Sequence, residues 1–139
     1  MDPSAMVFVD TSAWIATASA ADENHAAASA YFRDAVDSGV LLFTTRFVFA
    51  ETLIFIRKRV SVDKSIQFGE YLRTSPQVKM LEIPADLHEN AWEIFRKYRD
   101  WRDLSYVDCL SFVVMKNSGI KKAFCFDDDF RTYGFQAVP

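Results

Sequence analysis

The sequence predicts an α/β fold in which helices cover both faces of a mostly parallel sheet of four to five strands. Short apolar runs without a polar face alternate along the chain with longer segments of helical periodicity, which is the pattern of parallel strands joined by helices. At 139 residues the chain has the length of one domain. No internal repeat, low-complexity tract or Pro/Gly/Ser-rich linker interrupts it. We therefore expect a single domain over 1–139, with 1–5 as a disordered lead-in.

The first apolar run, Met6–Val9, has strand length and no polar face, as a buried parallel strand would. Helical spacing of apolar residues predicts helices over Ser12–Ala20 and Asn24–Val36. Gly39 then ends the second of these helices. The run Val40–Phe43 is the second predicted strand.

Thr45 is an expected N-cap for a helix over Arg46–Arg59. Another helix is predicted over Val62–Arg73, and Ser75-Pro76 ends it. The third predicted strand is Val78–Ile83. The helix 46–59 is apolar almost all round, so it is expected to bury every face, and in so small a domain this indicates a partner surface or a dimer interface.

In the last third of the chain, a helix is predicted over Pro84–Tyr98, with the proline in its first turn. Ser105 opens a helix that reaches Lys116, and Asn117-Ser118-Gly119 ends it. A fourth strand is predicted over Lys122–Phe126, and a short fifth strand over Phe135–Val138.

Composition and charge limit the classes of function. The formal net charge of −3 predicts no general affinity for nucleic acid, so such a ligand would need local basic patches or bound cations. Cys109 and Cys125 lie inside apolar runs and fit neither a zinc pattern nor a disulfide scaffold, so we expect buried free thiols in a reducing compartment. No leader is apparent, and no apolar run approaches the ~20 residues that span a bilayer. We expect a cytoplasmic protein that makes no membrane contact.

Four carboxylates interrupt apolar sequence. Asp10 directly follows M-V-F-V and Asp127 directly follows A-F-C-F, so each is expected at the carboxyl end of a strand, where open α/β sheets bind ligands. Glu51 projects from an apolar helix face, and Asp108 lies in the apolar segment Y-V-D-C-L-S-F. A buried carboxylate must be protonated, paired or bound to a metal. An all-oxygen cluster of this kind favours Mg²⁺ or Mn²⁺ over zinc.

Each of these acids also has a structural interpretation. Asp10 could cap the following helix, and Asp108 could complete a capping box with Ser105. Asp127-Asp128-Asp129 could be an acidic turn, which is the interpretation we favour for Asp128 itself. Glu51 has no such explanation unless Arg46 or Arg57 pairs with it. A coincidence of all four is much less probable than any one of these alternatives.

Basic and aromatic residues alternate after the helix 84–98. Arg96, Arg99 and Arg102 could bind RNA phosphates, while the neighbouring Tyr98 and Trp101 could stack on unpaired bases. A solvated helix end is the alternative interpretation of this cluster.

The four acidic motifs together resemble those of the PIN-domain nucleases. They read V-F-V-D-T-S-A, F-A-E-T-L, D-L-S-Y-V-D-C-L-S-F and F-C-F-D-D-D-F, in this order. The sequence is most similar to the VapC-type toxins of toxin–antitoxin pairs, from about Met6 to Pro139. The resemblance implies a three-layer α/β/α sandwich and an endoribonuclease that uses Mg²⁺ or Mn²⁺. It also implies homodimers and a cognate antitoxin that fills the site.

Matched motif by motif, the resemblance places Asp10, Glu51, Asp108 and Asp127 at the four metal-ligand positions. Asp129 matches a position that would assist through water, while Thr11 and Ser12 match residues that orient the first acid or bind phosphate. The expected reaction is hydrolysis of an RNA phosphodiester by metal-activated water.

Three alternatives remain open at this point. A phosphatase of the haloacid-dehalogenase type also begins from a strand-end Asp, but it needs a second Asp two positions later, where this chain has Ser12. A PIN nuclease of RNA maturation or quality control would share every motif. A non-catalytic module that binds RNA or protein would share the fold, although the complete set of four acids argues against it.

Overall fold

A computed structural model describes residues 5–139; of the expected lead-in 1–5, residues 1–4 lie outside the described part. The chain folds as one α/β unit with five strands and seven helices in this part. In chain order the elements are β1 (Met6–Val9), α1 (Thr11–Ala18), α2 (His25–Asp37), β2 (Leu41–Thr45), α3 (Arg46–Arg59), α4 (Val62–Thr74), β3 (Val78–Leu81), α5 (Ala85–Lys97), α6 (Tyr106–Ser118), β4 (Lys122–Phe124), α7 (Asp129–Tyr133) and β5 (Gln136–Val138).

The five strands form one sheet in the order β3-β2-β1-β4-β5, and every neighbouring pair is parallel. Val7 lies opposite Leu42 on one side and Lys122 on the other, which fixes the register of the central strand. The fold class predicted from the sequence is confirmed. The strand order reverses between β1 and β4, because the chain first moves outward through β2 and β3 and then returns to the other side of β1.

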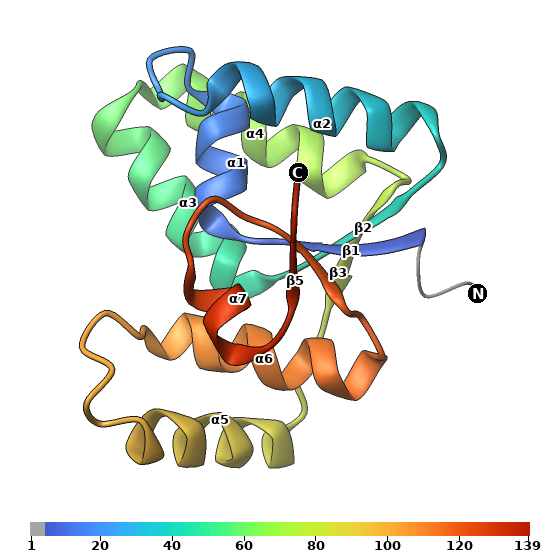
Figure 1. Ribbon diagram of the computed structural model, residues 1–139. Coiled ribbons are helices and arrows are strands. Elements are labelled where there is room, and N and C mark those ends of the chain that lie inside the picture. Colours follow the sequence, from blue (N-terminus) through green and yellow to red (C-terminus); the bar gives the residue numbers. More distant parts are fainter. Residues whose placement is uncertain (1–4) are drawn as a thin grey trace.

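This reversal decides which helices cover which face. Parallel strands are joined by right-handed connections, so helices on the outward path and the return path lie on opposite faces. The helices α1, α2, α3 and α4 pack against one another on one face, while α5 and α6 pack together on the other (Figure 1). The result is the three-layer α/β/α arrangement that the sequence predicts.

The core lies between the sheet and these helices. Phe8 and Phe124 of the two central strands are fully buried, as expected for strands covered on both faces. On the α6 face, the ring of Phe112 stacks on that of Tyr133 and meets that of Phe130 edge-on. This aromatic packing holds the short helix α7 against α6, close to the end of β4.

Several helix ends follow the predicted capping. The Thr45 side chain accepts a hydrogen bond from the backbone N–H of Val48, and Gly119 ends α6 in the left-handed region with a φ of 72°. One expectation is wrong in detail. Pro84 is the N-cap of α5 with an extended backbone, not a residue of its first turn. No helix in the described part of the chain is long and apolar enough to cross a bilayer.

The helix α3 departs from its expected burial. The sequence predicts that this helix buries every face, yet only Val48, Thr52 and Ile56 are buried along it. Ile54 is 58% exposed and Phe55 is 37% exposed. The other helices of its layer cover one side of α3 and leave the opposite side open to solvent or to a partner.

Candidate active site

The candidate site lies where the strand order reverses. Asp10 follows β1, and the loop after β4 carries Asp127 beside it. The sequence places Asp127 directly after a strand that ends at Phe126, but β4 stops two residues earlier, at Phe124. The backbone N–H of Phe126 donates to the Ser12 hydroxyl and not to a strand, so the chain has already left the sheet before Asp127.

All four predicted acids line one cleft. The cleft has a volume of about 510 Å³ and is bounded by loops that follow β1, β4 and α5 together with one face of α3. Among the described residues 5–139, eight carboxylate side chains line it, and no Lys, Arg or His does. The eight are Asp10, Asp22, Glu23, Glu51, Asp103, Asp108, Asp127 and Asp129.

Asp10 is both the N-cap of α1 and a wall of the cleft. Its Oδ2 accepts hydrogen bonds from the Ser12 backbone N–H at 3.3 Å and from the Ser12 hydroxyl at 2.8 Å. The same hydroxyl accepts the Phe126 N–H at 3.1 Å. Ser12 therefore joins the first acid to the loop that carries Asp127. The capping interpretation of Asp10 is confirmed, and it is compatible with a role at the site.

Glu51 is held by a hydroxyl group and not by an arginine. The Thr11 hydroxyl donates to Glu51 Oε1 at 2.6 Å, which connects the start of α1 to the middle of α3. Arg46, one of the two arginines considered as partners of this acid, instead pairs with Glu82. Arg57, the other, lines a separate groove on α3 and α4. Neither arginine therefore neutralises the charge of Glu51.

We expect Thr11→Val to lower catalytic activity about 10–100-fold while leaving the fold intact, because Glu51 is an expected metal ligand and loss of an outer hydrogen bond to a ligand typically has an effect of this size. Valine keeps the shape of the side chain but cannot donate to Glu51. Thr11→Ser, which keeps the hydroxyl, is the matched control and should stay within about threefold of the parent. Equal activity of the Val and Ser variants would show that this hydrogen bond does not position Glu51.

Asp108 belongs to a capping box. Its Oδ2 accepts the Ser105 backbone N–H at 3.2 Å, and the Ser105 hydroxyl accepts the Asp108 N–H at 2.9 Å. This reciprocal pair fixes Asp108 in the first turn of α6 and confirms the predicted capping box. Only one of the two carboxylate oxygens takes part in the capping box. The geometry leaves the other oxygen to the cleft.

The environment of the cleft raises the pKa of three acids, Asp10, Asp108 and Asp127, and so disfavours their ionised forms. Burial raises the pKa of Asp10 to about 6, the Ser12 hydrogen bond opposes this rise, and repulsion from Asp127 adds a smaller increase. Burial, and then repulsion from Asp10, raise the pKa of Asp108 to about 7. The pKa of Asp127 is also raised, by burial first and then by repulsion from Asp129. The folded protein thus holds together charges that lower its stability when no cation is present.

The chemistry of these donors suits a hard divalent cation. The oxygens are carboxylate and hydroxyl groups, which Mg²⁺ and Mn²⁺ prefer. Cys109 and Cys125 are buried, burial raises the pKa of each thiol to about 12, and neither cysteine lines the cleft. Within residues 5–139, no three His, Cys, Asp or Glu side chains are arranged to enclose an ion by themselves. Mg²⁺ commonly takes one or two carboxylates and keeps several waters.

The arginines predicted to bind RNA do not line the cleft. Arg96 pairs with Glu93 on the exposed side of α5, and Arg99 and Arg102 lie in the loop between α5 and α6. Asp128, for which we favoured an ordinary acidic turn, pairs with Arg131 outside the cleft.

Several lining residues were missed by the sequence analysis. Asp22 and Glu23 come from the turn between α1 and α2, and Asp103 comes from the loop before α6. Phe55, assigned to the core by its apolar surroundings, is instead an exposed wall of the cleft. Its place four residues after Glu51 was the available signal, because side chains four apart share a helix face.

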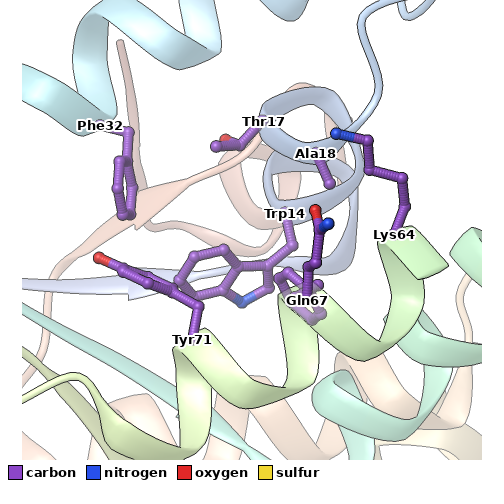
Figure 2. A pocket seen from close by; sticks show the side chains of 8 residues that line it. Trp14, Thr17, Ala18, Phe32, Lys64, Gln67 and Tyr71 are labelled. Carbon is purple, nitrogen blue, oxygen red and sulfur yellow. The ribbon is translucent and has the colours of Figure 1, made fainter.

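A second hollow, of about 310 Å³, lies between α1, α2 and α4 (Figure 2). The indole of Trp14 forms its floor, beside Phe32 and Tyr71. The rings pack edge to face, with the Trp14 and Phe32 centroids 6.1 Å apart. The charged residue that lines this hollow is Lys64, among mostly apolar and aromatic side chains.

Comparisons with known proteins agree with this geometry. The family model described as PIN domain matches residues 7–136. The chain is 35% identical over 133 residues to a protein named 23S rRNA-specific endonuclease VapC20 from Mycobacterium tuberculosis, in two strains, covering 96% of this chain and 98% of the relative. The crystal structure of M. tuberculosis VapC20, titled a Sarcin-Ricin loop cleaving toxin, superposes with a TM-score of 0.86 and 32% identity, covering 95% of this chain and 98% of that one.

The family model and the relatives match nearly the whole chain. The structure also gathers the acids where the strand order of the parallel sheet reverses. Both observations support the same family assignment. The protein belongs to the PIN-domain family and is a VapC-type nuclease of that family.

Proposed function

We propose that this protein is a metal-dependent endoribonuclease and the toxin of a type II toxin–antitoxin pair. The observation that carries the proposal is the cleft itself, in which eight carboxylates meet with no basic side chain among the lining residues. Such a site repels a phosphodiester unless cations reside in it. The family relationship supports the same activity.

The residues have separable roles in this proposal. Asp10, Glu51, Asp108 and Asp127 would hold Mg²⁺ or Mn²⁺, and Asp129 would assist through a water molecule. When bound, the metal would supply an activated water and neutralise charge on the phosphate. Thr11 and Ser12 keep the carboxylates of Glu51 and Asp10 in place through their hydroxyl groups. No serine or cysteine nucleophile is required, and both thiols stay protonated.

The proposed substrate is ribosomal RNA of the large subunit. The named relative is described as specific for 23S rRNA, and its crystal structure is titled a Sarcin-Ricin loop cleaving toxin. The cleft is open to solvent on one side, which suits a looped or single-stranded segment whose backbone can enter it. A cleavage site within an exposed ribosomal loop is therefore the first to be tested.

The proposed partners follow from the same relationship. A cognate antitoxin would block the cleft, and a second copy would form a homodimer. The partly uncovered helix α3 offers apolar surface for one of these contacts. We place the reaction in the cytoplasm, where RNA is accessible and where the two buried free cysteines stay reduced.

The test is cleavage of purified large-subunit ribosomal RNA by the purified protein, with RNA ends located by sequencing. We expect cleavage at one or few sites in Mn²⁺ or Mg²⁺, none in EDTA, and recovery when Mn²⁺ is added back. DNA of the same sequence serves as the control for substrate class. Cleavage that persists in EDTA, or no cleavage of any RNA together with no Mn²⁺ binding by calorimetry, would refute the proposal.

A further inference from the structure

Phe55 is an exposed aromatic side chain on the rim of a cleft that is lined mainly by acidic and polar residues. It lines the cleft together with the four predicted acids and remains 37% exposed. It lies one helical turn beyond Glu51 on α3, so both side chains project from the same face of that helix. The packing of the domain leaves part of this apolar ring exposed to solvent.

Arg59 lies one further turn along α3 and covers part of this ring. Its guanidinium carbon is 5.8 Å from the centroid of the Phe55 ring. The salt bridges within residues 5–139 involve Arg46, Arg96 and Arg131, and none involves Arg59. Its charge is therefore free to contact a ligand while its position is restrained by the aromatic ring.

The negative charge of the cleft explains why Phe55 and Arg59 would be needed to bind RNA. Eight carboxylates repel the phosphates of an approaching strand, and cations inside the cleft act only on the phosphate that reaches them. The neighbouring nucleotide must be held by groups outside the acid cluster. An exposed aromatic face and an adjacent guanidinium are the two groups that proteins use for an unpaired base and its phosphate.

We propose that Phe55 and Arg59 position the nucleotide next to the scissile phosphate. The base stacks on the Phe55 ring, and Arg59 contacts the phosphate of that nucleotide. This inference rests on the proposed ribonuclease function and deepens it, because it assigns the residues that hold the RNA strand in register with the acids. A stacking contact accepts any base, so it controls affinity more than sequence.

The same helix provides matched controls. Phe47 is 39% exposed but faces α5, where its ring lies 5.5 Å from that of His88 and away from the cleft. Arg57 lies two residues before Arg59 and lines the groove between α3 and α4. Substitution of Phe47 or Arg57 changes the same residue type in the same helix without touching the proposed contact.

The experiment measures KM and kcat for cleavage of an RNA transcript of the cleaved ribosomal region in Mn²⁺. We expect Phe55→Leu to raise KM about tenfold with kcat changed less than threefold, since loss of stacking on one base typically has an effect of this size. Phe55→Trp restores the aromatic face and should return KM to within about twofold of the parent. Phe47→Leu should match the parent in both constants.

Arg59→Gln tests the phosphate contact separately. We expect weaker binding of the same labelled transcript and a log–log salt dependence reduced by about one unit, measured by fluorescence anisotropy in an Asp108→Asn background that does not cleave. Arg57→Gln should leave this slope unchanged.

The outcomes separate this inference from the proposed function. If the parent protein cleaves RNA and Phe55→Leu has the KM of Phe47→Leu, the stacking contact is refuted while the nuclease stands. If Phe55→Leu lowers kcat and leaves both KM and RNA binding unchanged, the ring acts on the position of Glu51 and not on RNA. If Phe55→Leu instead prevents formation of a homodimer or of the antitoxin complex without affecting RNA binding, the exposed ring is a protein contact, and the inference is refuted as well.

Discussion

Replacing Asp108 by Asn is expected to abolish RNA cleavage and, at the same time, to stabilise the metal-free protein. Burial and repulsion from Asp10 raise the pKa of Asp108 to about 7, so its ionised form destabilises the fold at pH 8. Asparagine is uncharged, and its amide oxygen can still accept the hydrogen bond from the Ser105 N–H that completes the capping box. The variant therefore keeps the local structure and loses the charge.

The expected sizes of the two effects are large and opposite in sign. Cleavage in Mn²⁺ should fall at least about 100-fold, because the substitution removes a carboxylate that we propose as a metal ligand. The free energy of unfolding without metal should rise by about 1–2 kcal/mol after allowance for the partial exposure of the side chain, which corresponds to several degrees in the melting temperature. Calorimetric melting in EDTA and cleavage assays in Mn²⁺ measure these two quantities on the same preparation.

Asp128→Asn is the matched control for this variant. Asp128 belongs to the same acidic region of the protein but pairs with Arg131 on the surface and does not line the cleft. An exposed pair of this kind contributes less than about 1 kcal/mol, so we expect little change in stability and cleavage within about twofold of the parent. An Asp108→Asn protein that melts below the parent in EDTA would contradict the interpretation that the acids are mutually destabilising.

The stability of the metal-free protein is expected to fall as pH rises from 5 to 8. In the unfolded chain, the carboxyl groups of Asp10 and Asp108 titrate near 3.8, whereas in the folded protein their pKa values are about 6 and about 7. Between these values the folded state keeps protons that the unfolded state has released. The resulting stabilisation is complete below the unfolded pKa and is lost as pH rises through the folded pKa.

Metal binding should show the opposite dependence on pH. Divalent ions bind ionised carboxylates, so the rise in melting temperature caused by Mn²⁺ should be small at pH 5 and large at pH 8. Differential scanning calorimetry from pH 5 to pH 8.5, in EDTA and in Mn²⁺, checks both trends. Asp108→Asn provides the comparison, because its melting temperature in EDTA should depend less on pH. A parent protein whose melting temperature in EDTA rises over this range relative to the variant would contradict the assignment.

Most elements of the fold were predictable because their signals are local. Thr45 caps α3 through a hydrogen bond to a residue three positions away, and Ser105 forms its capping box over the same distance. The apolar run Met6–Val9 matches the observed β1. The errors lie at element ends. The strand β4 is shorter than predicted because Phe126 N–H is taken by Ser12, and the five-residue α7 was not predicted because one turn of helix has no detectable periodicity.

The sequence predicted the four central acids of the candidate site, but it did not predict most of the other residues that line the cleft. Asp10, Glu51, Asp108 and Asp127 interrupt apolar segments, which makes them visible in the sequence, and the structure brings all four to one cleft. An acid in a polar segment does not stand out from its neighbours in this way. Asp103 is one of these, and only the folded chain shows that the loop before α6 faces the cleft.

Phe55 illustrates the opposite error. Its apolar neighbours in α3 predict burial, and the same neighbours surround Ile56, which is fully buried. One residue further along a helix turns the side chain by about 100°, so adjacent positions can have opposite environments. Which of the two faces is covered depends on where α1 and α4 pack, and this is a property of the whole layer.

The sequence by itself determined the alternation of strands and helices, the caps, and the four carboxylates that interrupt apolar segments. These properties depend on residues within one or two helical turns of one another. Tertiary structure alone decided which loops meet across the edge of the sheet, and hence the places of Asp22, Glu23 and Asp103 in the cleft and the exposure of Phe55. The contact between Ser12 and Phe126, 114 positions apart, shows the physical reason. The return of the chain across β1 places distant segments side by side, and no local periodicity encodes that placement.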